Sequence, residues 1–159
     1  MSEVWGAEAT FELARDKLKA QLDALILAMV TDGTDPALNY AYDHHIVANL
    51  QLNAVTIEMA DLETEYMGVG APSGVNLKYI IPFEIHVHTA YENGQMDTVK
   101  NMRLLNSIDN YLNVNRDLGD KYRIDLTSTL NNQQEFDDSR TRGGSMQVII
   151  YVYINHTQA

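Results

Sequence analysis

Cysteine is absent from the chain, and proline occurs only three times among its 159 residues. The lack of cysteine excludes a disulfide framework, a thiol nucleophile and a thiolate metal site. Basic residues are scarce as well: 11 Lys and Arg stand against 22 Asp and Glu, which gives a formal charge of −11 at pH 7. Tight binding of nucleic-acid phosphates needs clustered Lys and Arg, so this excess of acidic residues disfavours a nucleic-acid-binding protein.

Long apolar runs are also missing. The longest, from about Ala24 to Val30, is far shorter than the ~20 residues that span a bilayer. The first five residues have neither the basic start nor the apolar core of a secretion signal, so we expect a protein of a reducing compartment. The hydrophobic fraction of 45% and the length instead predict one globular domain over residues 1–159 with a sizeable core.

Two segments have the apolar spacing of amphipathic helices. In the first, from about Thr10 to Val30, Thr10 is a candidate N-cap, and Gly33 and Pro36 end the helix. The second begins at Asp97 as its N-cap. The first predicted stripe comprises Phe11, Ala14, Leu18, Leu22, Leu25 and Met29, opposite Glu12, Arg15, Asp16, Lys19 and Asp23. The second comprises Val99, Met102, Leu105, Ile108 and Leu112.

Alternation of apolar and polar residues predicts the strands. They cover residues 54–59, roughly 77–91, 122–127 and 146–156. Both faces of the last strand are largely apolar, which indicates burial on both sides or a contact between subunits. The order of the elements predicts an α+β fold, in which two main helices pack on one face of a mostly antiparallel sheet.

The connections are predicted from proline, glycine and polar residues. Pro82 cannot donate a ladder hydrogen bond, so we expect its strand to lie at an edge of the sheet or to bulge there. Residues 36–52 are interpreted as a loop with a short helical turn, and residues 60–77 as a connection with a mobile loop. Residues 131–134, which are all Asn or Gln, are interpreted as a polar break.

One strand carries a possible metal site. Glu84, His86 and His88 alternate along it, so their side chains project from the same face. Two imidazoles and a carboxylate can bind Zn²⁺ or Fe²⁺. The alternative is a polar strand face, because three ligands from one strand span too far to close a site without a further ligand. We therefore predict no catalytic residue, cofactor or metal, and keep a metal-binding enzyme as an alternative.

Two other motifs lack features that the corresponding chemistry requires. Asp43, His44 and His45 could form an acid/base pair, but adjacent side chains usually diverge, so we expect ordinary loop histidines. The glycines at 68–74 suggest a phosphate loop, yet the Gly-Lys-Ser/Thr ending and a following helix are both missing. Neither motif predicts an enzyme.

The order of elements, together with the segment Phe136 to Gly144 before the last strand, resembles the tail terminator proteins of long-tailed bacteriophages. The resemblance extends more loosely to other neck and minor tail proteins. It covers about residues 8–155 and is most specific over residues 136–153. It implies a non-enzymatic virion protein without a cofactor: a ring, usually a hexamer, at the head-proximal end of the tail. There the ring stops polymerisation of the tail tube and joins the tail to the head.

The same resemblance implies the partners and the location. The partners are other copies of the chain, the tail tube protein and the head-side connector or head-closure protein, with no membrane. DNA passes through the lumen without specific binding, because an acidic wall repels it. The protein assembles in the host cytoplasm and resides in the tail or neck of the virion. The competing interpretation is another neck, minor tail or tail-tube protein of related topology.

Subunit contacts are expected where tyrosine gathers, since tyrosine suits interfaces. Arg140 and Arg142, which could also form an anion site or belong to a turn before the last strand, are included in the set. The alternative is that some of the tyrosines fill the core of one subunit. The predicted interface residues are Tyr66, Tyr79, Arg140, Arg142, Tyr151 and Tyr153.

Overall fold

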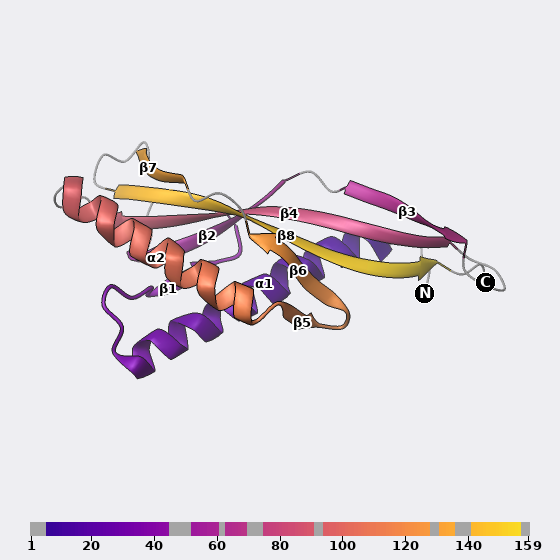
Figure 1. The fold of residues 1–159 in the computed structure, drawn as a ribbon, viewed down its shortest axis with the longest axis horizontal. Helices are drawn as coiled ribbons and strands as arrows, with labels where there is room; N and C mark the ends of the chain where they lie inside the picture. Colours follow the sequence, from indigo (N-terminus) through magenta and orange to yellow (C-terminus); the bar gives the residue numbers. More distant parts are fainter. Residues whose placement is uncertain are drawn as a thin grey trace.

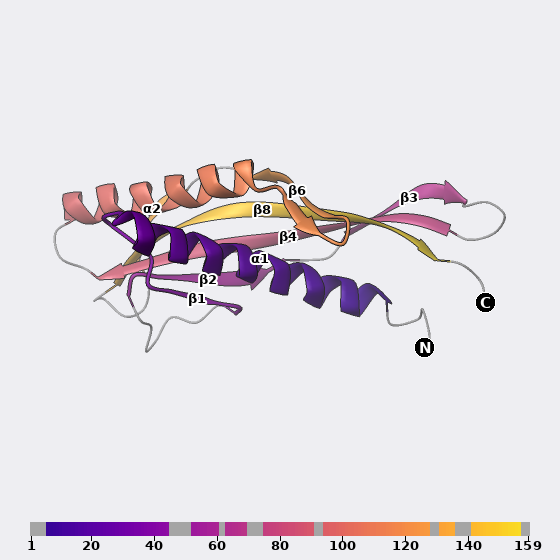
Figure 2. The same ribbon diagram turned by 90° about the horizontal axis from the view of Figure 1, so that it is seen from below.

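A computed structural model describes residues 6–44, 52–60, 63–69, 75–90, 94–127, 131–135 and 141–156. Two helices pack against one face of a mostly antiparallel sheet, so the α+β prediction is confirmed (Figure 1). Figure 2 shows both helices on the same side of the strands. The elements are α1 (Gly6–Asp32), β1 (Tyr40–Tyr42), β2 (Ala54–Met59), β3 (Glu63–Val69), β4 (Val75–Ala90), α2 (Gly94–Val114), β5 (Asp117–Gly119), β6 (Tyr122–Thr127), β7 (Asn131–Glu135) and β8 (Thr141–His156).

Two long strands form the spine of the sheet. β4 and β8 pair antiparallel over their whole lengths, from Val75 opposite His156 to Ala90 opposite Thr141. The strand order is β1-β2-β4-β8-β6-β5, while β3 also pairs with β4 and β7 also pairs with β8. β1 runs parallel to β2, and the other pairs are antiparallel. Hence β4 has neighbours on both sides.

Pro82 therefore lies in a central strand, and the prediction of an edge strand is wrong. The carbonyl of Pro82 accepts a hydrogen bond from the Ala60 N–H at 3.1 Å. The N–H and C=O of one strand residue point to the same side, so the missing donor of Pro82 also faces Ala60. β2 has just ended at Met59, and β3 joins β4 only from Glu63 opposite Ile80. The lost bond thus falls where β4 changes its neighbour, which explains how the sheet accepts a proline.

The core lies between this sheet and the two helices. The period-two prediction for β4 is confirmed, because its residues 79, 81, 83, 85 and 87 are all buried. In α1 the predicted stripe is buried, apart from a half-buried Phe11. In α2 the stripe is partly wrong, because Val99 and Met102 are exposed while Leu104 is buried. At 3.6 residues per turn, Val99 and Met102 lie away from the side that Leu104 shares with Leu105 and Ile108.

Several predicted boundaries are wrong. α1 begins at Gly6, before Thr10, and α2 begins at Gly94, which places Asp97 inside the helix. Residues 36–52 are expected to form a loop with a short helical turn; residues 40–42 form β1 instead of loop, and residues 45–51, where the turn could also fall, lie outside the described part.

Two predicted connections contain strands. β3 occupies residues 63–69 and β4 begins at residue 75, so the loop prediction for residues 60–77 is wrong over these stretches; residues 70–74 are not described. The predicted polar break is β7, and β8 begins at residue 141, ahead of the predicted residue 146. Acidic and amide side chains have low strand propensity, so here pairing with a long neighbouring strand outweighs local preference.

The turn between β5 and β6 depends on left-handed backbone conformations. Gly119 has a φ of 84°, and Asp120 and Lys121 follow with φ of 51° and 69°. A Cβ on Gly119 would meet Lys17 Nζ at 3.8 Å, which is ordinary contact. A side chain at Gly119 would therefore destabilise the fold through its strained backbone conformation and not through a steric clash.

We expect Gly119→Ala to lower the free energy of unfolding by about 1–2 kcal/mol, because alanine is strained at positive φ. Urea denaturation of the monomer measures the change. Gly119→Asn serves as the control and should lose less, since asparagine tolerates this conformation. Equal stability of Gly119→Ala and the unsubstituted chain would contradict this account of the turn.

Candidate functional site

The sheet face opposite the helices is partly open. β3 and the adjoining ends of β4 and β8 extend past the helices (Figure 2). We call Lys78, Ile80, Ile149, Tyr151 and Tyr153 the open face, because they alternate with core residues on β4 and β8. Tyr153 is 49% exposed and the other four are half-buried. The last strand is therefore buried on one face from Met146 to Val152, and the part of its second face that carries Ile149, Tyr151 and Tyr153 is available for a contact.

An aromatic cluster occupies the middle of the open face. The rings of Tyr151 and Tyr153 meet edge to face, with centroids 5.6 Å apart and planes at 82°. Lys78 Nζ lies 5.0 Å from the Tyr151 centroid and 5.8 Å from the Tyr153 centroid. The register explains the cluster, since Lys78 stands directly opposite Tyr153. Rigid amphipathic rings next to a cation suit a protein interface.

A hollow of about 550 Å³ lies beside this cluster, against the β5–β6 turn. Both signs of charge line it, with Asp117 and Asp120 next to Lys121 and Arg123. Lys17 of α1 donates to Asp120 Oδ2 at 2.9 Å and lowers the pKa of that carboxyl group. Such a mixed polar lining fits a contact surface better than a pocket for one small ligand.

The structure brings together only part of the predicted interface set. Tyr151 and Tyr153 lie side by side. Tyr79 is on the opposite face of the sheet, only 4% exposed, and burial raises its pKa, so the core alternative holds for this residue. Arg140 lies outside the described residues, as do the side chains of Tyr66 and Arg142. Lys78, which the sequence reasoning missed, becomes visible only from the β4–β8 register.

The outer side of α1 adds a second exposed apolar surface. Leu13, Ala20, Ala24 and Leu27 recur at steps of three, four and seven, and all four are exposed; Leu27 is 68% exposed. We call them the outer stripe. The sequence predicts charges on this side of α1, and Asp16 is indeed there. α1 is therefore apolar on two opposite sides, an arrangement typical of helices buried between two partners.

The predicted metal group has a different membership in the structure. Glu84 and His86 are joined by Glu58 of β2, and one possible ligand atom from each lies within 4.8 Å of the others. His86 Nε2 donates to Glu58 Oε2 at 2.7 Å and lies 4.0 Å from Glu84 Oε1. The sequence reasoning missed Glu58, because only the β2–β4 register places it opposite Glu84.

His88 does not belong to this group. It is fully buried, and its Nε2 is hydrogen-bonded to Thr56 Oγ1 at 2.9 Å. Residues two apart in a strand stand roughly 6.6 Å apart, whereas directly opposite residues of neighbouring strands have Cβ atoms about 5 Å apart. The cross-strand carboxylate of Glu58 therefore takes the place predicted for His88.

His44 and Asp43 form an exposed pair. His44 Nδ1 donates to Asp43 Oδ1 at 2.8 Å, and this bond lowers the pKa of Asp43. The expectation that these neighbours diverge is wrong for this pair, while His45 lies outside the described residues. Both side chains are largely open to solvent, and among the described residues no further ligand group joins them.

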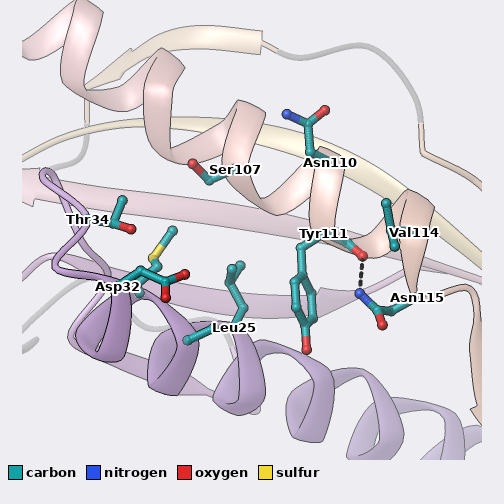
Figure 3. Close-up of a pocket in the computed structure, with 10 residues that line it drawn as sticks. Leu25, Asp32, Thr34, Ser107, Asn110, Tyr111, Val114 and Asn115 are labelled. Carbon is teal, nitrogen blue, oxygen red and sulfur yellow. Dashed lines mark hydrogen bonds between the residues drawn. The ribbon is translucent and has the colours of Figure 1, made fainter.

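A groove of about 410 Å³ lies between the C-terminal halves of the helices. Figure 3 shows the Tyr111 ring reaching from α2 toward α1, with Leu25 beside it. Asn115 donates to the Tyr111 carbonyl at 2.9 Å and closes this end of the groove. Among the described lining residues, Asp32 and Tyr111 carry the titratable side chains. The groove therefore suits an apolar side chain and offers little for acid/base chemistry.

These features define a two-helix α+β protein with two exposed apolar surfaces, the open face and the outer stripe. No protein-family model matches the sequence. A comparison with curated proteins also finds no match. In the described part of the chain, no helix is both long enough and apolar enough to cross a membrane.

Proposed function

We propose that the chain is a structural subunit of a ring at the head-proximal end of a phage tail. In this role it stops polymerisation of the tail tube and joins the tail to the head-side connector. The observation that carries the proposal is the outer stripe of α1. Four apolar side chains on the solvent side of a helix that is also apolar toward the core are expected to be covered in an assembly.

The proposed occupant of the outer stripe is the open face of a second copy of the chain. A ring needs two unlike surfaces on each subunit, so that each copy binds the next head to tail. The open face and the outer stripe lie on opposite sides of the subunit, since α1 covers the other face of the sheet. Both surfaces carry charges of both signs at their borders. Asp117, Asp120 and Arg123 lie beside the tyrosines, and Asp16 and Asp23, which pair with Arg15 and Lys19, lie beside the stripe.

The excess of acid fits the same assembly. A net charge of −11 would leave the ring acidic around a central channel. Like charge repels DNA phosphates, so DNA would slide through without specific binding. The tail tube protein and the head-side connector would occupy the two rims of the ring. Another neck, minor tail or tube protein with the same head-to-tail contact is the second candidate.

We expect the purified chain to form rings at the end of isolated tail tubes, where a contact with the tube can order the subunits. Negative-stain microscopy with the chain labelled measures its position and copy number. One ring at the head end of each tail supports a terminator. Labelled copies along the whole tail would identify a tube protein, and persistence of monomers with tubes present would contradict the proposal.

A further inference from the structure

Two carboxylates stand directly opposite each other on neighbouring strands. Glu58 of β2 pairs in register with Glu84 of β4, on the sheet face away from the helices. Like charges in directly opposite positions destabilise an antiparallel pair. The fold nevertheless places both next to one imidazole, that of His86. A positive charge between the two carboxylates would remove the repulsion.

The imidazole of His86 is buried and faces the two carboxylates. Only 7% of its side chain is exposed, whereas the side chains of Glu58 and Glu84 are 48% and 45% exposed. A carboxylate can only accept, so His86 Nε2 carries the hydrogen in its 2.7 Å bond to Glu58. The imidazole nitrogen is thus fixed by burial and aimed at the carboxylates. The two glutamate side chains are half exposed, so solvent reaches them and their rotamers are not fixed by surrounding packing.

We propose that Glu58, Glu84 and His86 bind one divalent transition-metal cation, for which Zn²⁺ is the probe. Zinc ligand atoms at about 2.0–2.2 Å from the ion stand roughly 3.3 Å apart in tetrahedral geometry. The separations of 2.7 Å and 4.0 Å from His86 Nε2 bracket this value, so small rotations of the glutamates complete the site. On binding, the neutral imidazole changes to the tautomer that carries its hydrogen on Nδ1, so that the Nε2 lone pair is donated to the metal. Water fills the fourth position.

The ligand set also predicts selectivity. One imidazole nitrogen with two carboxylate oxygens suits Zn²⁺ and similar borderline cations. Mg²⁺ and Ca²⁺ prefer shells made entirely of oxygen and should bind weakly. His88 takes no part in the site, because Thr56 holds its Nε2.

Calorimetric titration of the full chain with ZnCl₂ tests the site, with a thermal melt as the second readout. We expect one ion per chain and a melting temperature raised by about 5 °C at an ion concentration near 100 times Kd. Glu84→Gln and Glu58→Gln should each weaken binding at least about tenfold. Both side chains are half exposed, so the variants are expected to fold, and their far-UV circular dichroism checks this.

Asp43→Asn is the matched control. His44 and Asp43 form a histidine–carboxylate pair at 2.8 Å, but no third ligand group joins them among the described residues. Zn²⁺ binding should be unchanged in this variant. The proposal is overturned if millimolar Zn²⁺ does not bind, if Glu84→Gln and Glu58→Gln bind like the unsubstituted chain, or if Mg²⁺ competes equally. None of these results depends on whether the chain forms rings.

Discussion

Phe83→Ala is expected to lower the free energy of unfolding by about 3–5 kcal/mol. Phe83 is fully buried in the middle of β4, and its ring centroid lies 6.1 Å from that of Phe11 in α1. Removing the ring leaves a cavity between the central strand and the helix, which the long β4–β8 pair prevents from collapsing. Urea denaturation of the monomer, followed by circular dichroism, measures the loss.

Met59→Ala is the control for this cavity. Met59 stands directly opposite Phe83 in the register of β2 and β4, but it is exposed. The substitution should change the free energy of unfolding by less than about 1 kcal/mol. A loss of the same size in both variants would mean that the core is not organised around the face of β4 that bears Phe83.

The buried face of β4 could be predicted from the sequence, because the alternation of side chains along a strand is a local property. Residues 79, 81, 83, 85 and 87 are all buried, whereas Ile80, Pro82 and Glu84 between them are half-buried, and His86 departs from this alternation because it is buried as well. α1 shows the limit of the same reasoning. Its core stripe was predicted, but the charges on the other side concealed the spacing of Leu13 and Leu27. Their exposure becomes apparent only when the helix is placed on the sheet.

The register between paired strands could not be predicted from the sequence. Glu58 joins Glu84 and His86 only because β2 and β4 pair without a shift over six residues. Lys78 reaches the two tyrosines because β4 meets β8 in one particular alignment. Such alignments depend on long-range pairing, and a slip of one residue would send each side chain to the opposite face. β7 was missed for a related reason, since its Asn and Gln residues form a strand only beside β8.

Leu27→Asp and Tyr153→Asp are each expected to abolish ring formation while leaving the subunit folded. Leu27 is 68% exposed on the outer stripe and Tyr153 is 49% exposed on the open face, so a carboxylate costs little in the monomer. In the assembled ring, Leu27→Asp would bury a charge, and Tyr153→Asp would replace the aromatic ring of the contact by a carboxylate opposite Lys78. Each change should weaken the contact by at least about 2 kcal/mol, or roughly 30-fold in Kd. Val99→Asp, an exposed site on α2 outside both surfaces, is the control and should assemble normally.

Mixing the two variants distinguishes the head-to-tail contact from a symmetric one. Leu27→Asp subunits keep an intact open face, and Tyr153→Asp subunits keep an intact outer stripe. One good contact can therefore form between unlike variants, but the resulting dimer has no second pair of intact surfaces and cannot grow. At a concentration high enough for unsubstituted subunits to associate without tail tubes, light scattering should show monomers for each variant alone and dimers for the mixture. Self-association of Tyr153→Asp alone would indicate stripe-to-stripe pairing, and self-association of Leu27→Asp alone would indicate face-to-face pairing; either result would exclude the proposed ring contact.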